Sequence, residues 1–475
     1  MRIFMIGSGA VAQCTLPILL KELKISPSSV TVMDFVDNRH RIAEPLKQGV
    51  KFIQERITQE NYKEILSKHL FPGDIFIDLA WDIDTIALLQ WCHDNNIRYV
   101  NSSIELWDPY QDVNDKQPQA LTLYARQMKI IELIKSFKKK GATAILDHGA
   151  NPGLVSHFTK QALKEIAEKI IAKKPQDPRV PKLKEAIDHK NFAALAQLTG
   201  VKIIQIAERD SQIISDPKKV NEFVNTWSIA GLYEEGLAPS ELGWGTHEHC
   251  KPEGIMYHNN GPQNQILLKS RGMDTLARSW VPSGDIIGMV IRHGEAYGIS
   301  ERLTVWENGK AIYRPTVYYA YCVCDAAIAS LYELHMRQLE LQPKLRILND
   351  EIIDGIDELG CFLLGHDFKA WWIGSLLDIH EARRLVPHQN ATTVQVAISV
   401  VAAVNYMIKF PNEGICLPDD LEYTEILNFA KPYLGKFISQ QVDWSPLNRK
   451  PTYFDYEDHK IDPKNEWQFT SFLVK

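Results

Sequence analysis

The sequence predicts an α/β protein with two main parts: an N-terminal, doubly wound parallel sheet of the Rossmann type, and a second α+β domain with a mixed or antiparallel sheet. A glycine-rich turn of the form G-x-G-x-x-A begins at Gly7, and strand-like and helix-like segments alternate up to residue 150. Strands then follow strands between residues 201 and 324. Alternation is typical of parallel sheets, whereas strands in succession are typical of antiparallel ones.

The first element is a strand over residues 2–6, which leads into the turn and then into a helix that runs to residue 20. In such a turn the first glycine permits the tight bend, the second lets the backbone approach a pyrophosphate, and the small last residue allows close packing of helix on strand. The N-terminus of the helix offers unpaired N–H groups to the anion. We therefore expect a dinucleotide to contact Gly7, Ser8, Gly9, Ala10, Val11 and Ala12.

The second strand, residues 30–33, ends at Asp34. An acidic residue at this position bonds the ribose hydroxyls of adenosine and repels a 2′-phosphate, so the sequence favours NAD over NADP. The alternation then continues with strands over residues 74–80, 97–100 and 143–147 and a helix over residues 85–95. We assign residues 1–150 to an NAD-binding domain.

Residues 151–390 form the predicted substrate-binding and dimerisation domain. It contains a charged, proline-interrupted helical insertion at residues 171–200. The predicted strands cover residues 201–208, 264–270, 286–293, 301–307 and 317–323, and the predicted helices cover residues 325–339, 392–408 and 420–430. We expect residues 391–475 to form C-terminal helices and a tail that pack back on the NAD-binding domain.

Composition is that of an ordinary globular protein, with 45% hydrophobic and 24% charged residues among 475. The net charge of −6 gives no indication of a nucleic-acid partner. Seven scattered cysteines lack the spacing of a disulfide framework or a zinc site, so we expect a cytoplasmic location. The longest apolar run, residues 394–408, is shorter than the roughly 20 residues of a membrane span. We expect a buried helix there and no membrane partner.

Polar residues follow several strands of the predicted parallel sheet, where ligands bind in such folds. Asp82, Glu105 and Asn151 come after three of these strands and are expected near a nicotinamide. Taken singly, each is equally well explained as a helix cap or a loop hydrogen bond.

The second part of the chain brings acidic and aromatic residues in quick succession. Glu208, Trp227 and Glu235 occur within about 30 residues, and His293 ends a predicted strand. Loop glutamates are more often solvated charges than catalytic groups, but the face of Trp227 is suited to hold an ammonium or iminium ion. His293 is either a proton shuttle or a core histidine.

Two other signals are discounted. His247 and His249 share one strand face without a third ligand at a telling spacing, so no metal is expected. Adjacent Arg383 and Arg384 are more simply a solvated face than an anion clamp.

The segments GSGAVA, AWDID, NSSIELW, DHGANPGLVSHF, AERDSQ, NTWS, LYEEG and RHGEA, in this order and spacing, resemble the bacterial homospermidine synthases of the saccharopine-dehydrogenase-like superfamily. The resemblance covers nearly the whole chain. GSGAVA is shared with many dehydrogenases, whereas GANPG, NTWS and EEG are much more specific.

The resemblance implies NAD as a bound redox cofactor and the synthesis of homospermidine from two putrescines with loss of ammonia. The positions that match the family's active site are Glu105, Asn151, Glu208, Trp227, Glu235 and His293. The cofactor contacts expected with the glycine turn are Asp34, Asp82 and Asn151. We also expect a homodimer.

Two other functions compete with this one. A dehydrogenase that acts on a carboxylated amine, such as saccharopine or a carboxypolyamine, needs an arginine or lysine clamp, and Arg209, Arg278 and Arg292 are available. A non-catalytic NAD-binding sensor predicts instead that the carboxylates of the second domain face solvent.

Overall fold

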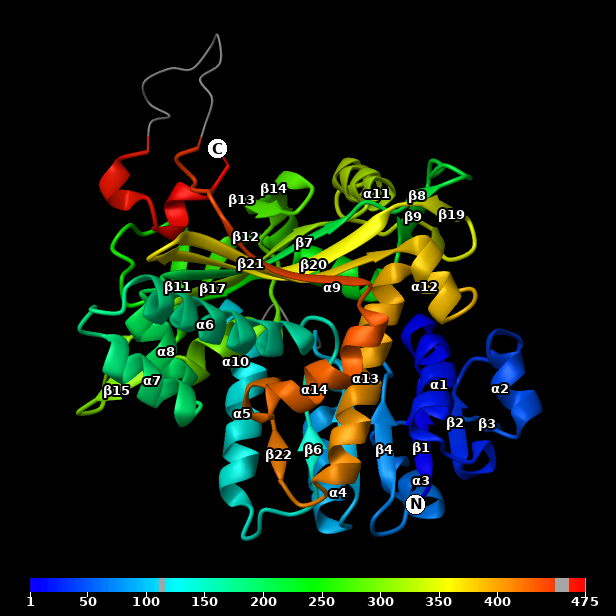
Figure 1. The fold of residues 1–475 in the computed structure, drawn as a ribbon. Helices are drawn as coiled ribbons and strands as arrows, with labels where there is room; N and C mark the ends of the chain where they lie inside the picture. Colours follow the sequence, from blue (N-terminus) through cyan, green and yellow to red (C-terminus); the bar gives the residue numbers. More distant parts are fainter. Residues whose placement is uncertain (111–115, 449–460, 475) are drawn as a thin grey trace.

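The computed structural model describes residues 1–110, 116–448 and 461–474. A seven-stranded sheet, blue to cyan in Figure 1 apart from one orange strand, lies below a larger, mainly green and yellow sheet. The order of the first sheet is β22-β6-β5-β4-β1-β2-β3, with parallel pairing throughout. Its strands are β1 (Ile3–Ile6), β2 (Val30–Asp34), β3 (Lys51–Gln54), β4 (Ile75–Asp78), β5 (Arg98–Asn101), β6 (Ala144–Ile145) and β22 (Ile415–Cys416). The predicted Rossmann-type sheet is confirmed.

Helices cover both faces of this sheet because successive side chains of its strands point to opposite sides. Ile3 and Met5 of β1 pack in one apolar cluster with α1 and α13, whereas Phe4 and Ile6 pack in another with α3 and α4. The helices of this part are α1 (Ala10–Leu23), α2 (Ala43–Gln48), α3 (Tyr62–His69), α4 (Thr85–Asp94), α5 (Leu123–Ser136) and α13 (Ala391–Lys409).

The second sheet has ten strands and is mixed, as predicted. Strand β7 pairs parallel with β17 and antiparallel with β20, and the path runs β11-β12-β10-β17-β7-β20-β21-β23. Its strands are β7 (Ile203–Asp210), β10 (Pro239–Gly243), β11 (Ile255–Tyr257), β12 (Gln265–Arg271), β13 (Leu276–Val281), β14 (Gly284–Met289), β17 (Thr316–Cys322), β20 (Ile356–His366), β21 (Lys369–Asp378) and β23 (Lys436–Val442). Its helices are α6 (Leu154–Lys173), α7 (Val180–Asp188), α8 (Phe192–Thr199), α9 (Ile229–Leu237), α10 (Gly294–Arg302), α11 (Asp325–Met336), α12 (Ile379–Leu385) and α14 (Tyr423–Ala430).

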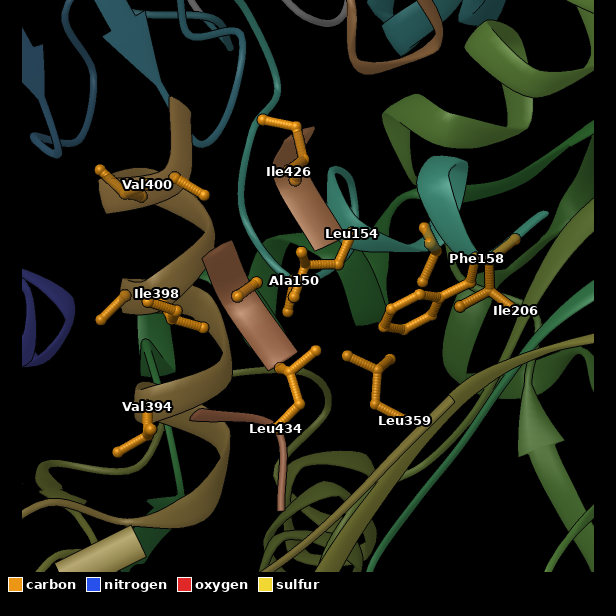
Figure 2. Close-up of a cluster of buried hydrophobic side chains, with 14 of the residues drawn as sticks. Ala150, Leu154, Phe158, Ile206, Leu359, Val394, Ile398, Val400, Ile426 and Leu434 are labelled. Atoms are coloured by element: carbon orange, nitrogen blue, oxygen red, sulfur yellow. The ribbon is translucent and has the colours of Figure 1, made fainter. Parts of the chain in front are cut away.

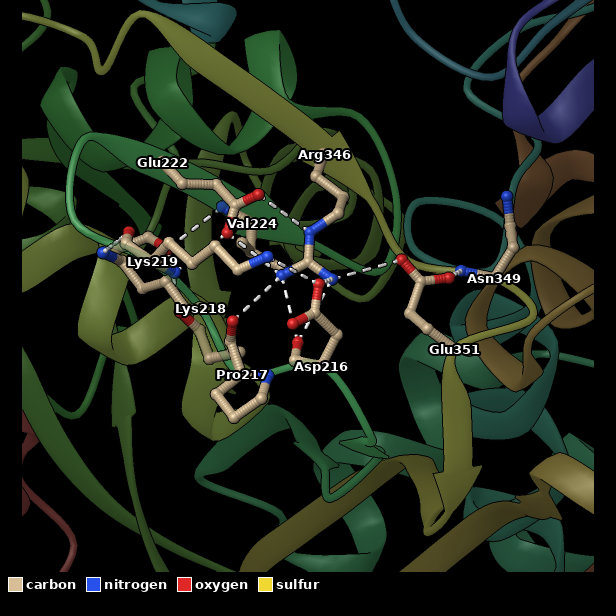
Figure 3. Close-up of polar contacts among 11 residues, drawn as sticks. Asp216, Pro217, Lys218, Lys219, Glu222, Val224, Arg346, Asn349 and Glu351 are labelled. Atoms are coloured by element: carbon tan, nitrogen blue, oxygen red, sulfur yellow. Dashed lines mark hydrogen bonds and ion pairs between the residues drawn. The ribbon is translucent and has the colours of Figure 1, made fainter.

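Three small strand pairs complete the second part: β8 (Ile213–Ile214) with β19 (Ile352–Asp354), β9 (Glu222–Asn225) with β18 (Lys344–Ile347), and β15 (Val305–Glu307) with β16 (Lys310–Tyr313). Arg346 of β18 joins β18 to β9 through Glu222 (Figure 3). Its Nε donates to Glu222 Oε1 at 2.9 Å and its Nη2 to Oε2 at 3.0 Å. This paired geometry is that of a strong arginine–carboxylate bond.

Helix α13 is the buried helix that the apolar run predicts. By length and composition this helix could cross a membrane, because its most apolar 18-residue stretch has a mean hydropathy of 1.6. However, 83% of that stretch is buried inside the protein. Figure 2 shows Val394 and Ile398 of α13 in one cluster with Phe158 of α6 and Leu359 of β20. This cluster contains residues of both sheets, so one continuous apolar core joins them. Burial of each such side chain stabilises the fold by about 1.5–3 kcal/mol.

The C-terminal segment is divided between the two sheets. Strand β22, orange in Figure 1, pairs with β6 and extends the Rossmann-type sheet. The described residues after β22 contact both domains: Tyr433 Oη donates to Glu22 Oε1 of α1 at 2.5 Å, whereas β23 pairs with β21 and Leu473 pairs with Ala277 of β13. The backbone of these segments finds its hydrogen-bond partners at the second sheet. Residues 449–460 and 475 lie outside the described residues.

Candidate active site

A cavity of about 770 Å³ lies where the two parts of the protein meet, and we call it the interdomain cavity. On one side it is lined by the segments that follow β1, β4, β5 and β6, at the carboxyl ends of the parallel strands. On the other side it is lined by β7, α9, β17 and the segment after β14. The predicted site residues that line it are Gly7, Gly9, Ala10, Val11, Ala12, Asp34, Asp82, Glu105, Asn151, Glu208, Trp227, Glu235 and His293.

The glycine turn has the geometry that a dinucleotide requires. Gly7 has a φ of +85°, and a Cβ there would lie 2.5 Å from the carbonyl oxygen of Leu79. Gly9 has open space where a Cβ would be. It is the N-cap residue of α1, and because glycine has no side chain, no side-chain hydrogen bond caps the helix N-terminus. The free N–H groups at this end fit a pyrophosphate.

Asp34 is held beside the turn by Ser8. Its Oδ2 accepts hydrogen bonds from the backbone N and from the Oγ of Ser8, both at 2.6 Å. The side chain of Ser8 is fully buried and is the one member of the predicted cofactor set that does not line the cavity. Ser8 therefore positions the acidic residue, while the turn backbone remains open to a ligand.

Glu105, in the segment after β5, lines the cavity and is buried, with 4% of its surface exposed. Burial raises its pKa to about 7, although Arg126, whose Nη1 lies 3.7 Å from Oε2, acts in the other direction. Asp82, after β4, is exposed, and its pKa is raised by partial burial and by the charge of Glu234. A cation that binds near either carboxyl group would therefore lower its pKa and favour its ionised form.

Glu208 of β7 lies on the second-domain side of the cavity in a buried hydrogen-bonded group. Its Oε2 accepts from Tyr319 Oη at 2.6 Å and from Asn151 Nδ2 at 3.0 Å. Burial raises the pKa of Glu208 to about 8, and the Tyr319 bond only partly opposes this. Asn151 thus connects the Rossmann-type sheet with a carboxyl group of the second domain.

His293 is buried between two carboxylates. Its Nε2 lies 3.1 Å from Glu235 Oε1, and its Nδ1 lies 3.3 Å from Glu295 Oε2. Burial lowers the pKa of His293, but the charges of Glu295 and Glu235 outweigh burial and hold the pKa well above its ordinary value. Burial raises the pKa of Glu235. At neutral pH the raised pKa favours the imidazolium form of the ring.

Trp227 presents its ring to the same cavity. Its Nε1 donates to Tyr321 Oη at 3.0 Å, and a Cβ on Gly231 would lie 2.5 Å from ring atom Cζ3. The hydrogen bond and the small neighbour together fix the plane of the indole.

Glu234 and Glu235 lie on helix α9 rather than on the loop that the sequence suggested. Ser228 caps this helix, because its Oγ accepts from Gly231 N at 3.0 Å. Adjacent helix positions point in different directions, about 100° apart. Glu235 therefore meets His293, whereas Glu234 meets two arginines.

Several residues that build the cavity were missed from the sequence. The residues that line it without having been predicted include Tyr319, Tyr321, Arg126, Glu234 and Asp147. Tyr319 and Tyr321 lie two positions apart on β17 and so share one face. That spacing in the segment VYYAYCV was the available signal, whereas Arg126 is brought to the site only by the packing of α5.

The discounted residues have structural contacts. His247 Nε2 lies 3.0 Å from the carbonyl oxygen of Trp467, and His249 Nε2 lies 3.0 Å from Asn465 Oδ1. Within the described ranges no group of three or more His, Cys, Asp or Glu side chains has the geometry of a metal site. These histidines bind the C-terminal tail. Of the arginines considered for a clamp, Arg209 bonds Asp325 and Arg278 bonds the carbonyl oxygen of Pro446.

Comparison with known proteins identifies the family. The saccharopine dehydrogenase NADP binding domain matches residues 3–145, and the saccharopine dehydrogenase C-terminal domain matches residues 149–442. Homospermidine synthases of Blastochloris viridis and Mesorhizobium japonicum are 38% and 36% identical over 479 residues, which cover 100% of this chain and 97% and 96% of theirs.

Comparison with solved structures supports the same family and fold. The crystal structure of the homospermidine synthase from Legionella pneumophila in complex with NAD is 35% identical, with a TM-score of 0.87 over 100% of this chain and 98% of that chain. Apo saccharopine dehydrogenase (L-Glu forming) from Saccharomyces cerevisiae, at 12% identity and a TM-score of 0.52 over 93% of this chain and 99% of that chain, shares the fold. The chain therefore belongs to the homospermidine synthase family and has the two domains of the saccharopine dehydrogenase type.

Proposed function

We propose that this protein is an NAD-dependent homospermidine synthase that joins two putrescines and releases ammonia. The observation that carries the proposal is the meeting, in one cavity, of an open dinucleotide turn with buried carboxyl groups and the Trp227 ring. Bound NAD supplies a hydride acceptor and then a hydride donor. The protein's own residues have to hold two amines, move protons and exclude water.

The carboxyl groups of Glu105, Glu208 and Glu235 suit a diammonium ion. Putrescine is a dication at neutral pH, and ammonium groups form strong charge-assisted hydrogen bonds with carboxylates. Burial raises the pKa of Glu105 to about 7 and that of Glu208 to about 8, so protonated forms are present near neutral pH. A bound ammonium favours the ionised forms, so diamine binding releases protons from the site.

Proton transfer has to precede loss of hydride, because a hydride leaves carbon only from a neutral amine. We assign the proton acceptor to Glu235. Its raised pKa makes it a stronger base than an ordinary carboxylate. Its partner His293 is already protonated. His293 then returns a proton to the departing ammonia or holds the charge of Glu235 in place.

Trp227 faces the carbon that becomes cationic in this scheme. An iminium ion over the face of an indole is stabilised by up to about 2 kcal/mol when water is excluded. The second putrescine adds to this carbon, ammonia leaves, and the resulting imine is reduced. Electrons balance because the hydride removed in the first half is restored in the second.

A dehydrogenase of carboxylated amines is the second candidate, and the cavity charges disfavour it. Arg292 lines the cavity, but its Nη2 is bonded to Glu234. Arg126, the other buried arginine of the wall, is bonded to the same carboxylate at 3.1 Å. A non-catalytic sensor is disfavoured because Glu208 and Glu235 line a cavity rather than face open solvent.

We further propose a homodimer formed through the second domain and a reducing, cytoplasmic location. Seven free cysteines support the location. The mass of the native protein by sedimentation equilibrium tests the dimer directly, since a single-chain mass would contradict it.

The experiment that tests the reaction follows deuterium. Putrescine deuterated at both nitrogen-bearing carbons is incubated with the protein and NAD, and the product is analysed by mass spectrometry. Homospermidine should retain deuterium at the newly joined carbon, because the hydride is stored and returned before the cofactor leaves. Added unlabelled NADH should not dilute the label. Free deuterated NADH with an aldehyde and no triamine would point to the dehydrogenase, and no conversion at all to the sensor.

Cofactor choice is tested at Asp34. Its carboxylate, held by Ser8, is placed to bond ribose hydroxyls and to repel a 2′-phosphate. Replacing Asp34 with Ala should weaken NAD about 10-fold or more while NADP affinity changes little or improves. Binding of both nucleotides is measured by calorimetry. Equal losses for the two would remove Asp34 as the ribose ligand. Asp37→Ala, at an exposed aspartate bonded to Arg39, is the matched control.

A further inference from the structure

Glu234 sits at the centre of a buried charged group in the cavity wall. Its Oε1 accepts from Arg126 Nη2 at 3.1 Å and also from Arg292 Nη2 and Tyr110 Oη. The two arginine side chains are 6% and 3% exposed, and that of Glu234 is 11% exposed. Arg292, Arg126 and Glu234 all line the interdomain cavity.

This arrangement places two guanidinium groups on one carboxylate oxygen. Arg126 comes from α5 of the NAD-binding part and Arg292 from the segment after β14 of the second part. Guanidinium groups are well suited to bind a carboxylate, because their N–H donors match its two oxygens. Here that position is filled by a carboxylate of the protein itself.

The wider charge pattern supports the same view. Arg292 Nη1 also donates to the carbonyl oxygen of Leu121 at 2.9 Å, and its Nη2 to Tyr110 Oη at 2.7 Å. Arg126 Nη1 donates to the carbonyl oxygen of Ile104 at 2.8 Å. The guanidinium groups are therefore held rigidly, and removal of the Glu234 charge would leave their Nη2 atoms directed at the cavity.

We propose that Glu234 is the residue that excludes carboxylated amines from this site. It occupies the arginine pair that would otherwise bind a substrate carboxylate, and its own charge repels that group. Specificity arises in this way when a protein builds repulsion against the wrong ligand as well as attraction for the right one. The inference rests on the proposed function, because it takes the favoured ligand to be a diamine without a carboxylate.

The test compares putrescine with ornithine, which is putrescine with a carboxylate on one nitrogen-bearing carbon. Dissociation constants for both are measured by calorimetry without added NAD, so that putrescine is not consumed, on the wild-type protein and on Glu234→Gln. The ratio of the ornithine constant to the putrescine constant should fall at least about 10-fold in the variant, because ornithine gains two charge-assisted bonds. An unchanged ratio would overturn the proposal.

A second variant keeps the test valid if loss of the carboxylate that the two buried arginines share impairs folding. Glu234→Gln combined with Arg126→Gln restores the charge balance and leaves Arg292 alone to bind the carboxylate. Its ratio should fall by a smaller factor in the same direction. A ratio equal to that of the wild type, in a protein whose melting temperature is unchanged, would contradict the proposal.

Glu222→Gln is the matched control, since Glu222 also holds a guanidinium group but on Arg346 and away from the cavity (Figure 3). Its ratio should equal that of the wild type, and a fall there would assign the effect to general loosening and overturn the proposal. The two hypotheses fail separately. A wild-type protein that does not bind putrescine refutes the proposed function, whereas putrescine binding without a gain for ornithine refutes only the role of Glu234.

Discussion

Glu235→Gln should lower turnover of putrescine by about 10²- to 10⁴-fold, which is the usual contribution of a general base. In the wild type, His293 Nε2 lies 3.1 Å from Glu235 Oε1. Gln keeps the shape of Glu235 and this hydrogen bond, but it takes no proton from the ammonium group. NAD binding should stay within about 2-fold, because the dinucleotide turn lies on the opposite wall. Steady-state rates of homospermidine formation and calorimetric binding of NAD measure the two effects.

The pH dependence separates this explanation from a structural one. Loss of the negative charge beside His293 removes one of the two carboxylates that raise its pKa, so the imidazolium should lose its proton at a lower pH in the variant. As the pH is raised, the residual rate of the variant should therefore begin to decline at a lower pH than the rate of the wild type. Glu358→Gln is the control, because Glu358 is a buried carboxyl of β20 that accepts from Ser283 N at 2.9 Å outside the cavity lining. A variant at Glu235 with wild-type turnover would remove this residue from the mechanism.

Trp227→Glu should abolish most of the activity, whereas Trp227→Phe should retain part of it. Phenylalanine still presents a ring face to a cation, while a carboxylate presents none, and the difference of about 2 kcal/mol corresponds to about 30-fold in rate. The bond from Nε1 to Tyr321 Oη, 3.0 Å long, is lost in both variants, so it does not contribute to the difference. Initial rates at saturating putrescine, with NAD affinity measured in parallel, provide the comparison.

Equal loss in Phe and Glu variants would show that Trp227 serves through its N–H or its size rather than through the ring face. Trp306→Phe is a suitable control, because Trp306 of β15 is 45% exposed and does not line the cavity. That variant should have wild-type kinetics.

Much of the fold could be predicted because local pattern and local structure agree along the N-terminal part. The turn at Gly7 follows a buried strand and begins a helix, and all three elements are present as β1 and α1. The strand pair β20 and β21 was missed for a physical reason. Both strands are buried on both faces, so most of their side chains are apolar and the period-two alternation that marks a half-exposed strand is absent.

The candidate site was predictable in its residue types but not in its partnerships. Glu208, Trp227, Glu235 and His293 could be singled out because acidic and aromatic residues follow one another closely and their segments resemble a known family, and the cavity brings all four together. Arg126 carried no such signal. It lies in an ordinary amphipathic helix, and only the packing of α5 against the second domain brings it to Glu234.

By itself the sequence determined the class of the first sheet, the turn that suits a dinucleotide and the acidic residue that ends β2, because each depends on neighbours within about 30 residues. Only the tertiary structure decided which carboxylate meets which cation. Glu234 and Glu235 are adjacent in sequence, yet the helical rotation between them directs one to Arg126 and Arg292 and the other to His293. Both contacts are made with partners more than 50 residues away, and no local pattern encodes them.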